Sequence, residues 1–156
     1  MKRAMTVLFL MFLQAAAWAQ ISISTSGSWS RSVDASDLVS GAGSNLASSY
    51  ESTAGAITLT ITGTVGGTDS WRIDVKKVDA SWSSVLPLYF RRTDAGSGGS
   101  VSGGTTYQQI TDADLSFFSG AGDVSGIGLQ AQVGGVSVTV PPAAYSTAVY
   151  FTVVDN

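Results

Sequence analysis

The chain has 156 residues, of which 12% are charged, and a net charge of −3 at neutral pH. This length is typical of one domain, and the mild acidity argues against binding to nucleic acid or to an anionic membrane surface. The sequence contains no Cys and no His, so it lacks disulfides, the commonest general base and the commonest neutral metal ligand.

The first nineteen residues have the pattern of a secretory signal peptide. A positively charged start is followed by an apolar run at residues 6–13 and by a small-x-small cleavage site that ends at Ala19. The apolar run is shorter than the roughly 20 residues that span a bilayer. We therefore expect a signal peptide at 1–19, no membrane span after its cleavage, and one secreted domain at 20–156. The expected location is the periplasm, the cell surface or the extracellular space.

After residue 20 the apolar residues recur with the period of two that is typical of half-buried β-strands. β-Branched residues dominate these segments, as a pleated surface prefers. The expected strands before the C-terminal one lie at 21–29, 56–63, 71–77, 85–92, 127–133 and 136–140.

The connections between these strands carry turn signals. Gly134-Gly135 predicts a hairpin between the fifth and sixth strands. Residues 36–53 predict a long connection with one helical turn capped by Asp34 or Ser36. Residues 95–106, AGSGGSVSGGTT, predict a flexible loop. Pro87 cannot donate to a ladder and predicts an edge strand or a bulge.

Residues 145–154 form the last expected strand. Val149, Tyr150 and Phe151 place apolar or aromatic side chains on both of its faces. A strand that is covered on both faces belongs near the middle of a sheet, so we expect it to close its own fold. The first strand is then the one that is free to reach another molecule.

Seven short strands without a helix predict an all-β fold, an Ig-like antiparallel β-sandwich of about seven strands. A small β-barrel is the competing architecture.

The sequence predicts no catalytic centre. A Ser nucleophile needs a base, and only Lys76 or Lys77 is available, on a charged strand rather than in an apolar pocket. Asp112 and Asp114 have a spacing seen in Ca²⁺ loops, but the segment lacks the closing Glu of an EF-hand, so a turn capped by Asp is the simpler interpretation. We expect no enzyme, no metal and no cofactor, and leave open whether this Asp pair binds an ion.

One segment combines aromatic rings with cations beside the glycine-rich loop. Tyr89, Arg91 and Arg92 suit an anionic or sugar ligand, although they equally suit an edge strand that is protected by charge. Trp82 lies in a predicted turn and is expected to be exposed. Together these four residues are the candidate ligand-binding face.

Residues 126–153, GIGLQAQVGGVSVTVPPAAYSTAVYFTV, resemble the C-terminal end of secreted bacterial Ig-like surface proteins of the spore coat protein U and fimbrial-subunit type. The matching positions are Ile127, Leu129, Pro141, Pro142, Tyr145, Val149, Phe151, Thr152 and Val153. Many fimbrial subunits carry a Cys pair, which this chain lacks. They also carry an N-terminal extension that donates a strand to the next subunit, whereas here we expect almost no sequence between the cleavage site and the first strand, so a donated strand must be the segment 21–29 itself. The resemblance implies self-association through strand pairing. The candidate strand here consists of Ile21, Ile23, Thr25, Gly27 and Trp29. The same pattern is equally compatible with an ordinary first strand that packs in its own sheet.

These observations favour an exported, non-catalytic structural or assembly protein of the bacterial cell surface, fimbria-like or coat-like. Its expected partners are copies of itself or other surface proteins. The alternative is a secreted binding module for a ligand such as carbohydrate.

Overall fold

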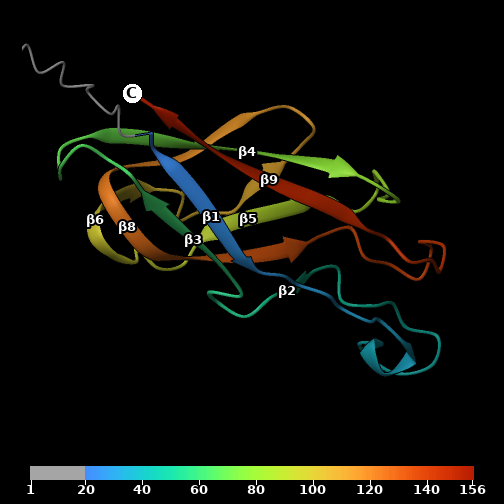
Figure 1. Cartoon of the computed structure of the whole chain (residues 1–156). Coiled ribbons are helices and arrows are strands. Elements are labelled where there is room, and N and C mark those ends of the chain that lie inside the picture. Colours follow the sequence, from blue (N-terminus) through green and yellow to red (C-terminus); the bar gives the residue numbers. More distant parts are fainter. Residues whose placement is uncertain (1–19) are drawn as a thin grey trace, which may run out of the picture.

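The computed structural model of the chain describes residues 20–156, which fold into an antiparallel all-β structure (Figure 1). This confirms the predicted fold class, while the expected signal peptide at 1–19 lies outside the described residues. The strands are β1 (Ser22–Gly27), β2 (Tyr50–Glu51), β3 (Ile57–Thr62), β4 (Ser70–Asp79), β5 (Leu88–Arg92), β6 (Ser97–Gly103), β7 (Gln108–Ile110), β8 (Leu115–Val133) and β9 (Thr147–Asp155).

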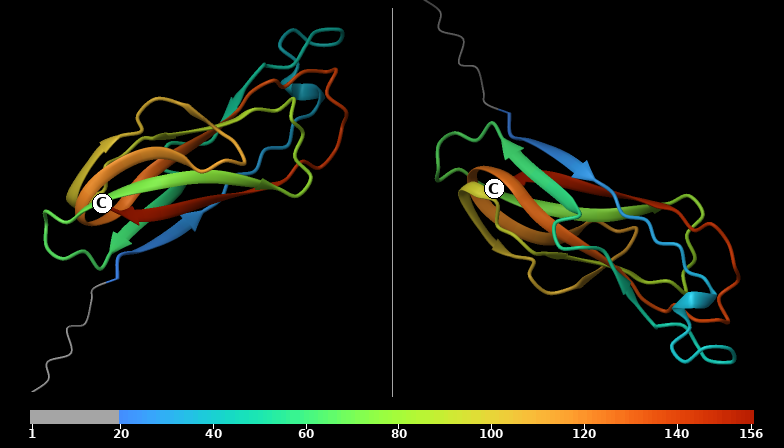
Figure 2. Two further views of the ribbon diagram at one scale, coloured as in Figure 1. Left: turned by 90° about the horizontal axis from the view of Figure 1, so that it is seen from above. Right: turned by 90° about the horizontal axis from the view of Figure 1, so that it is seen from below.

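The 19-residue strand β8 organises the fold because it belongs to both layers. Its first half pairs with β4, and its second half pairs with β3 and β5. Between the halves it curls around one end of the molecule (Figure 2). Gly122 and Gly126 lie in this bend with φ of 73° and 76°, a backbone region that glycine adopts without a steric cost. The predicted strand at 127–133 is only the second half of β8.

The strands form two layers that are joined through β8 (Figure 2). One layer contains β1, β3, the second half of β8, β5 and β7; the other contains β9, β4, the first half of β8 and β6. The ends of the pairing path, β1 and β9, approach each other without forming a ladder. The architecture is therefore a sandwich that is nearly closed into a barrel.

A single apolar core fills the space between the layers. Trp71 lies at its centre, fully buried, with its indole Nε1 donating to the Gly122 carbonyl at 2.8 Å and its ring edge-to-face with Phe118. This bond attaches β4 to the bend of β8. The other core residues are Ile57, Leu59, Ile61, Ile73, Val75, Leu88, Phe90, Ile110, Phe117, Val124, Ile127, Leu129 and Ala131.

The predicted strand at 136–140 is wrong. The amide of Val136 donates to the Ser48 carbonyl at 3.1 Å, and the amide of Val138 donates to Asn45 Oδ1 at 3.0 Å. These bonds tie the segment to the long connection between β1 and β2 instead of a neighbouring strand. Gly134-Gly135 consequently ends β8 without making a hairpin.

The predicted flexible loop at 95–106 is also wrong, because residues 97–103 form β6 and pair with β8 around its bend. A Cβ atom on Gly99 would collide with the Ala121 carbonyl. The glycines of this segment therefore permit a close approach of two backbones.

The fourth predicted strand begins later than expected, at Leu88, with Pro87 just before it. Strand β5 is paired on both sides, by β7 and β8, so it is not an edge strand. Pro87 still contributes to the structure, because its carbonyl accepts from the Gly134 amide at 2.9 Å.

The predicted helical turn is confirmed as a 3-10 helix at Ala35–Asp37. Asp34 caps it by accepting from the Ser36 amide at 2.8 Å, and Asp37 Oδ2 accepts from the Asp34 amide at 3.0 Å. This reciprocal arrangement is a capping box.

Strand β9 is an edge strand, so its predicted place in the middle of a sheet is wrong. Among the strands of residues 20–156, it pairs with β4 alone. Its inward residues Val149, Phe151 and Val153 are half-buried, whereas the outward Tyr150 is 53% exposed. The outward residues carry apolar and aromatic groups without a second layer to cover them.

Candidate functional site

The two edge strands β1 and β9 flank an apolar groove with a volume of about 1130 Å³. The strands run in opposite directions and diverge with distance from the C terminus (Figure 1). The floor of the groove includes Ile57, Leu88, Phe90 and Ala131, all of which belong to the core. One end of the core is therefore covered less completely than the rest.

The β9 wall of the groove is formed by alternate residues of that strand. Thr147, Val149 and Phe151 line the groove, and all three are only half-buried. The ring of Phe151 meets the ring of Phe90 edge to face. This contact joins the edge strand to the opposite layer.

The β1 wall contains the predicted self-assembly strand, of which Ile21 and Trp29 flank the observed strand instead of belonging to it. Ile21, Ile23 and Trp29 are half-buried and pack against the core, whereas Thr25 and Gly27 are exposed and line the groove. Strand β1 contains no fully buried residue.

In this structure β1 pairs with β3 of its own chain and with no other described strand. The register places Ser22 opposite Thr62, and their hydroxyl oxygens lie 2.9 Å apart. The opposite edge of β1 faces the groove. The candidate strand is thus an ordinary member of its own sheet that keeps one free edge.

The charged groups near the groove are engaged with one another. Arg31 forms an ion pair with Asp37, and its guanidinium carbon lies 5.0 Å from the centroid of the Tyr50 ring. The hydroxyl and amide of Ser36 hold the pKa of Asp34 below its ordinary value. The groove therefore offers an incoming chain mainly apolar and uncharged polar surface.

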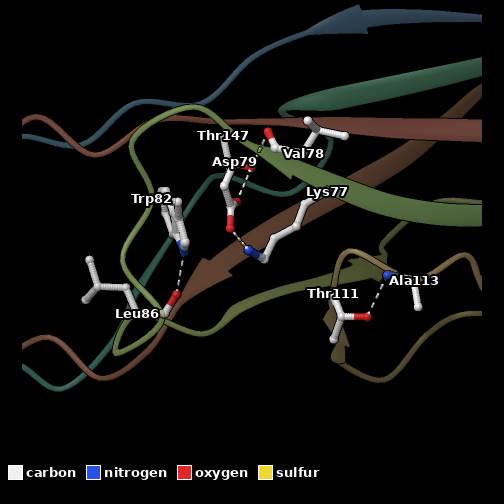
Figure 3. A network of polar contacts seen from close by, with 8 residues as sticks. All are labelled: Lys77, Val78, Asp79, Trp82, Leu86, Thr111, Ala113 and Thr147. Carbon is white, nitrogen blue, oxygen red and sulfur yellow. Dashed lines mark hydrogen bonds and ion pairs between the residues drawn. The ribbon is translucent and has the colours of Figure 1, made fainter.

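Trp82 lines the groove, and the prediction that it is exposed is wrong. It is half-buried, packs against the core, and donates from Nε1 to the Leu86 carbonyl at 2.7 Å (Figure 3). The turn between β4 and β5 folds back and covers this indole.

A polar network joins β4 to the start of β9 beside Trp82 (Figure 3). Lys77 and Asp79 form an ion pair, and Thr147 Oγ1 lies 2.8 Å from Asp79 Oδ1 and 3.1 Å from the Val78 carbonyl oxygen. The Lys77 ammonium, followed by the Thr147 hydroxyl, lowers the pKa of Asp79. This network fixes the point at which β9 begins.

The predicted ligand-binding face is divided between two places. Trp82 lies at the groove, on the core side of β5, whereas Tyr89 and Arg91 alternate with core residues and lie on its outer side. Arg92 donates from Nε to the Gly103 carbonyl at 2.9 Å and links β5 to β6. The four residues do not form one site.

The structure adds partners around Arg91 that the sequence did not reveal. Arg91 Nε and Nη2 both donate to Gln130 Oε1, at 2.9 and 2.8 Å, and the guanidinium lies 4.7 Å above the centroid of the Tyr107 ring. Glu51 joins this group through Gln130 and Gln132. The available signal was the alternation of two glutamines with apolar residues between 127 and 133.

The acidic residues do not gather into an ion site in the part of the chain that is described. Within residues 20–156, no group of three or more His, Cys, Asp or Glu side chains could hold a metal ion. Asp114 pairs with Lys76 at 3.1 Å, and the Ala113 amide donates to Thr111 Oγ1 at 3.3 Å (Figure 3). The backbone bond in this segment is thus accepted by Thr111 and not by the Asp side chains that were predicted to cap the turn.

Among the described residues, no helix is long and apolar enough to cross a membrane. Searches with the whole sequence and structure found no matching protein family, no matching curated protein and no matching solved structure.

Proposed function

We propose that this chain is an exported, non-catalytic structural or assembly protein of the bacterial cell surface, a fimbria-like or coat-like subunit. Its copies associate by exchange of strand β1, so that β1 of one copy occupies the place beside β3 of the next. The observation that carries this proposal is the position of β1, which is paired on one side only and faces β9 across an apolar groove.

Few contacts hold β1 in its own sheet, so little opposes its exchange. It has one neighbouring ladder and no fully buried side chain. The apolar contribution of the segment 21–29 to the core comes from Ile21, Ile23 and Trp29, which are only half-buried. An edge strand of this kind is a ready template for pairing with another chain.

The segment that follows β1 has the length of a hinge. Residues 28–49 contain one 3-10 turn and one isolated bridge, between Leu38 and Leu46, but no strand. Domain swapping exchanges an identical element between copies and uses such a connection to span the distance. Exchange from one copy to the next in a single direction produces an open chain, as a fibre or coat requires.

The chemistry of β1 matches the place that it would occupy. The segment 21–29, ISISTSGSW, carries no charge, and the charged groups beside the groove already have partners. When an incoming copy of this strand docks, none of its own side chains is a charged group that would have to give up its bound water.

Three acidic groups have structural roles. The pKa values of Asp34, Asp79 and Asp123 are all lowered, chiefly by hydrogen bonds to Ser36, Lys77 and Thr64 respectively. A general acid needs a carboxyl whose pKa is raised. These three carboxylates instead hold turns and strand ends in place.

Light scattering of the segment 20–156 over a roughly hundredfold concentration range tests the proposal, because mass action favours assembly at high concentration. We expect a mass that increases with concentration. Replacing Ile21→Asp and Ile23→Asp together should abolish that increase while circular dichroism still shows a β-sheet fold.

The matched control is Ser24→Asp with Ser26→Asp, which adds the same charge to exposed positions of β1. This control should assemble like the unmodified protein. A monomeric unmodified protein at every concentration, or multimers that survive the double isoleucine substitution, would refute strand exchange.

A further inference from the structure

The outer side of the β8–β5–β7 region carries a face of amide and aromatic side chains, on the opposite side of these strands from the groove. Tyr89 stands opposite Gln132 on β8 and Gln109 on β7. Arg91 stands opposite Gln130. Because neighbouring residues of a strand point to opposite faces, this surface shares strands with the groove but no side chains.

Gln130 holds the charged groups of this face in fixed positions. It is 7% exposed, and its Oε1 accepts both bonds from Arg91. Its Nε2 donates to the Ser52 carbonyl at 2.7 Å and lies 3.3 Å from Glu51 Oε2. The guanidinium and the carboxylate are therefore positioned by the same buried amide, as a preorganised binding surface requires.

Tyr107 supports the Arg91 guanidinium from one side. Its ring lies beneath the Arg91 guanidinium. Its hydroxyl oxygen is buried close to the Glu51 carboxylate, so a ligand on the surface does not reach it. Burial, followed by the nearby Glu51 carboxylate, raises the pKa of Tyr107 and keeps the phenol protonated. Tyr107 therefore holds Arg91 in place and does not itself meet a ligand.

The balance of charge on this face indicates the class of ligand. Arg91 and Glu51 contribute one charge of each sign, and both already bond to neutral amides. The remaining groups are amides and half-exposed phenols, such as Tyr89 and Gln132, which both donate and accept hydrogen bonds. A phosphate or an acidic polymer would find no surplus of positive charge there.

We infer that the face formed by Glu51, Tyr89, Arg91, Gln130 and Gln132 binds a neutral carbohydrate. Sugar hydroxyls pair with amide and carboxylate groups, and the Tyr89 ring offers an apolar surface to the C–H side of a sugar ring. The inference does not depend on strand exchange, because β1 contributes nothing to this face. A failure of either proposal leaves the other standing.

Affinity electrophoresis tests the inference with the segment 20–156 in native gels that contain hydroxyethyl cellulose, dextran or galactomannan. A gel with polygalacturonate provides the acidic comparison. We expect retardation by at least one neutral polysaccharide and none by polygalacturonate. Retardation by no neutral polymer, or by polygalacturonate alone, would overturn the inference.

Two substitutions then locate the site. Tyr89→Ala and Gln132→Ala should each weaken the apparent affinity for the retarding polysaccharide by roughly tenfold, while the thermal unfolding midpoint shows that the variants still fold. Tyr150→Ala is the matched control, because Tyr150 is an exposed tyrosine on β9, in the other layer. Unchanged retardation of both face variants, or an equal loss in the Tyr150 variant, would exclude this face.

Discussion

The rings of Phe90 and Phe151 meet edge to face, with their centroids 5.9 Å apart and their planes at 73°. Phe90 is buried in β5, whereas Phe151 is half-buried in β9. The pair connects the two layers at the floor of the groove. It limits how far β9 can separate from the rest of the fold.

Replacing Phe151→Ala should destabilise the domain by about 2 to 3 kcal/mol, somewhat below the usual cost for a fully buried phenylalanine, because this side chain is only half-buried. Urea unfolding measures the change. The control is Tyr150→Ala on the same strand, whose exposed side chain should contribute no more than about 0.5 kcal/mol. Equal losses in the two variants would contradict the assignment of faces in β9.

Replacing Gly120→Ala should destabilise the domain by about 3 kcal/mol. A Cβ atom at this position would collide with the Trp71 ring and with the Ser100 carbonyl, so the core and β6 must both shift. Gly126→Ala is the informative comparison. Its added Cβ meets no atom within 4 Å, so only its φ of 76° is unfavourable, at a cost of about 1 kcal/mol.

Comparing the decreases in unfolding free energy of these two variants tests how β8 packs on either side of its bend. Thermal or urea unfolding of both variants gives these decreases directly. If Gly126→Ala were the more destabilising change, the close packing of Trp71 against Gly120 would be wrong.

The strands that could be predicted from sequence are those with apolar residues at alternate positions. Ile57, Leu59 and Ile61 of β3 are an example, and all three are buried. Strand β6 could not be found in this way, because its Gly and Ser residues carry no apolar alternation. Its position depends on backbone contact with the bend of β8.

The candidate site was predictable to a similar extent. The edge residues Ile21 and Ile23 were recognised from their alternation. The contact between Arg91 and Tyr107 was not, because it depends on the pairing of β5 with β7. The position of β9 at an edge was also not predictable, because the local sequence does not show that the outward side of β9, with Tyr150, has no second layer over it.

Acid should weaken the domain in part through Asp123. Its carboxylate accepts from the Thr64 hydroxyl at 2.7 Å and from the Thr64 amide at 2.9 Å, and these bonds lower its pKa from the ordinary 3.8. A lowered pKa stabilises the fold at pH values above 3.8. That contribution is lost as the pH falls through the folded-state pKa.

Asp123→Asn tests this assignment, because the amide retains the shape and one acceptor oxygen but cannot ionise. Urea midpoints at about pH 7 and about pH 2.5 should differ less in this variant than in the unmodified protein. Asp112→Asn is the control, since Asp112 is exposed. An identical pH dependence in the Asp123 variant and the unmodified protein would exclude Asp123 as a source of acid sensitivity.

The central claim is that β1 leaves its own sheet when copies associate. Ser22 and Thr62 are register partners on β1 and β3. The natural chain contains no cysteine, so the double substitution Ser22→Cys and Thr62→Cys allows one disulfide, which would lock β1 to β3. The decisive measurement is the solution mass of this variant by light scattering, oxidised and reduced, over the same concentration range. Strand exchange predicts a monomer in the oxidised protein and multimers that grow with concentration in the reduced protein. Equal masses in the two states, whether monomeric or multimeric, would contradict it.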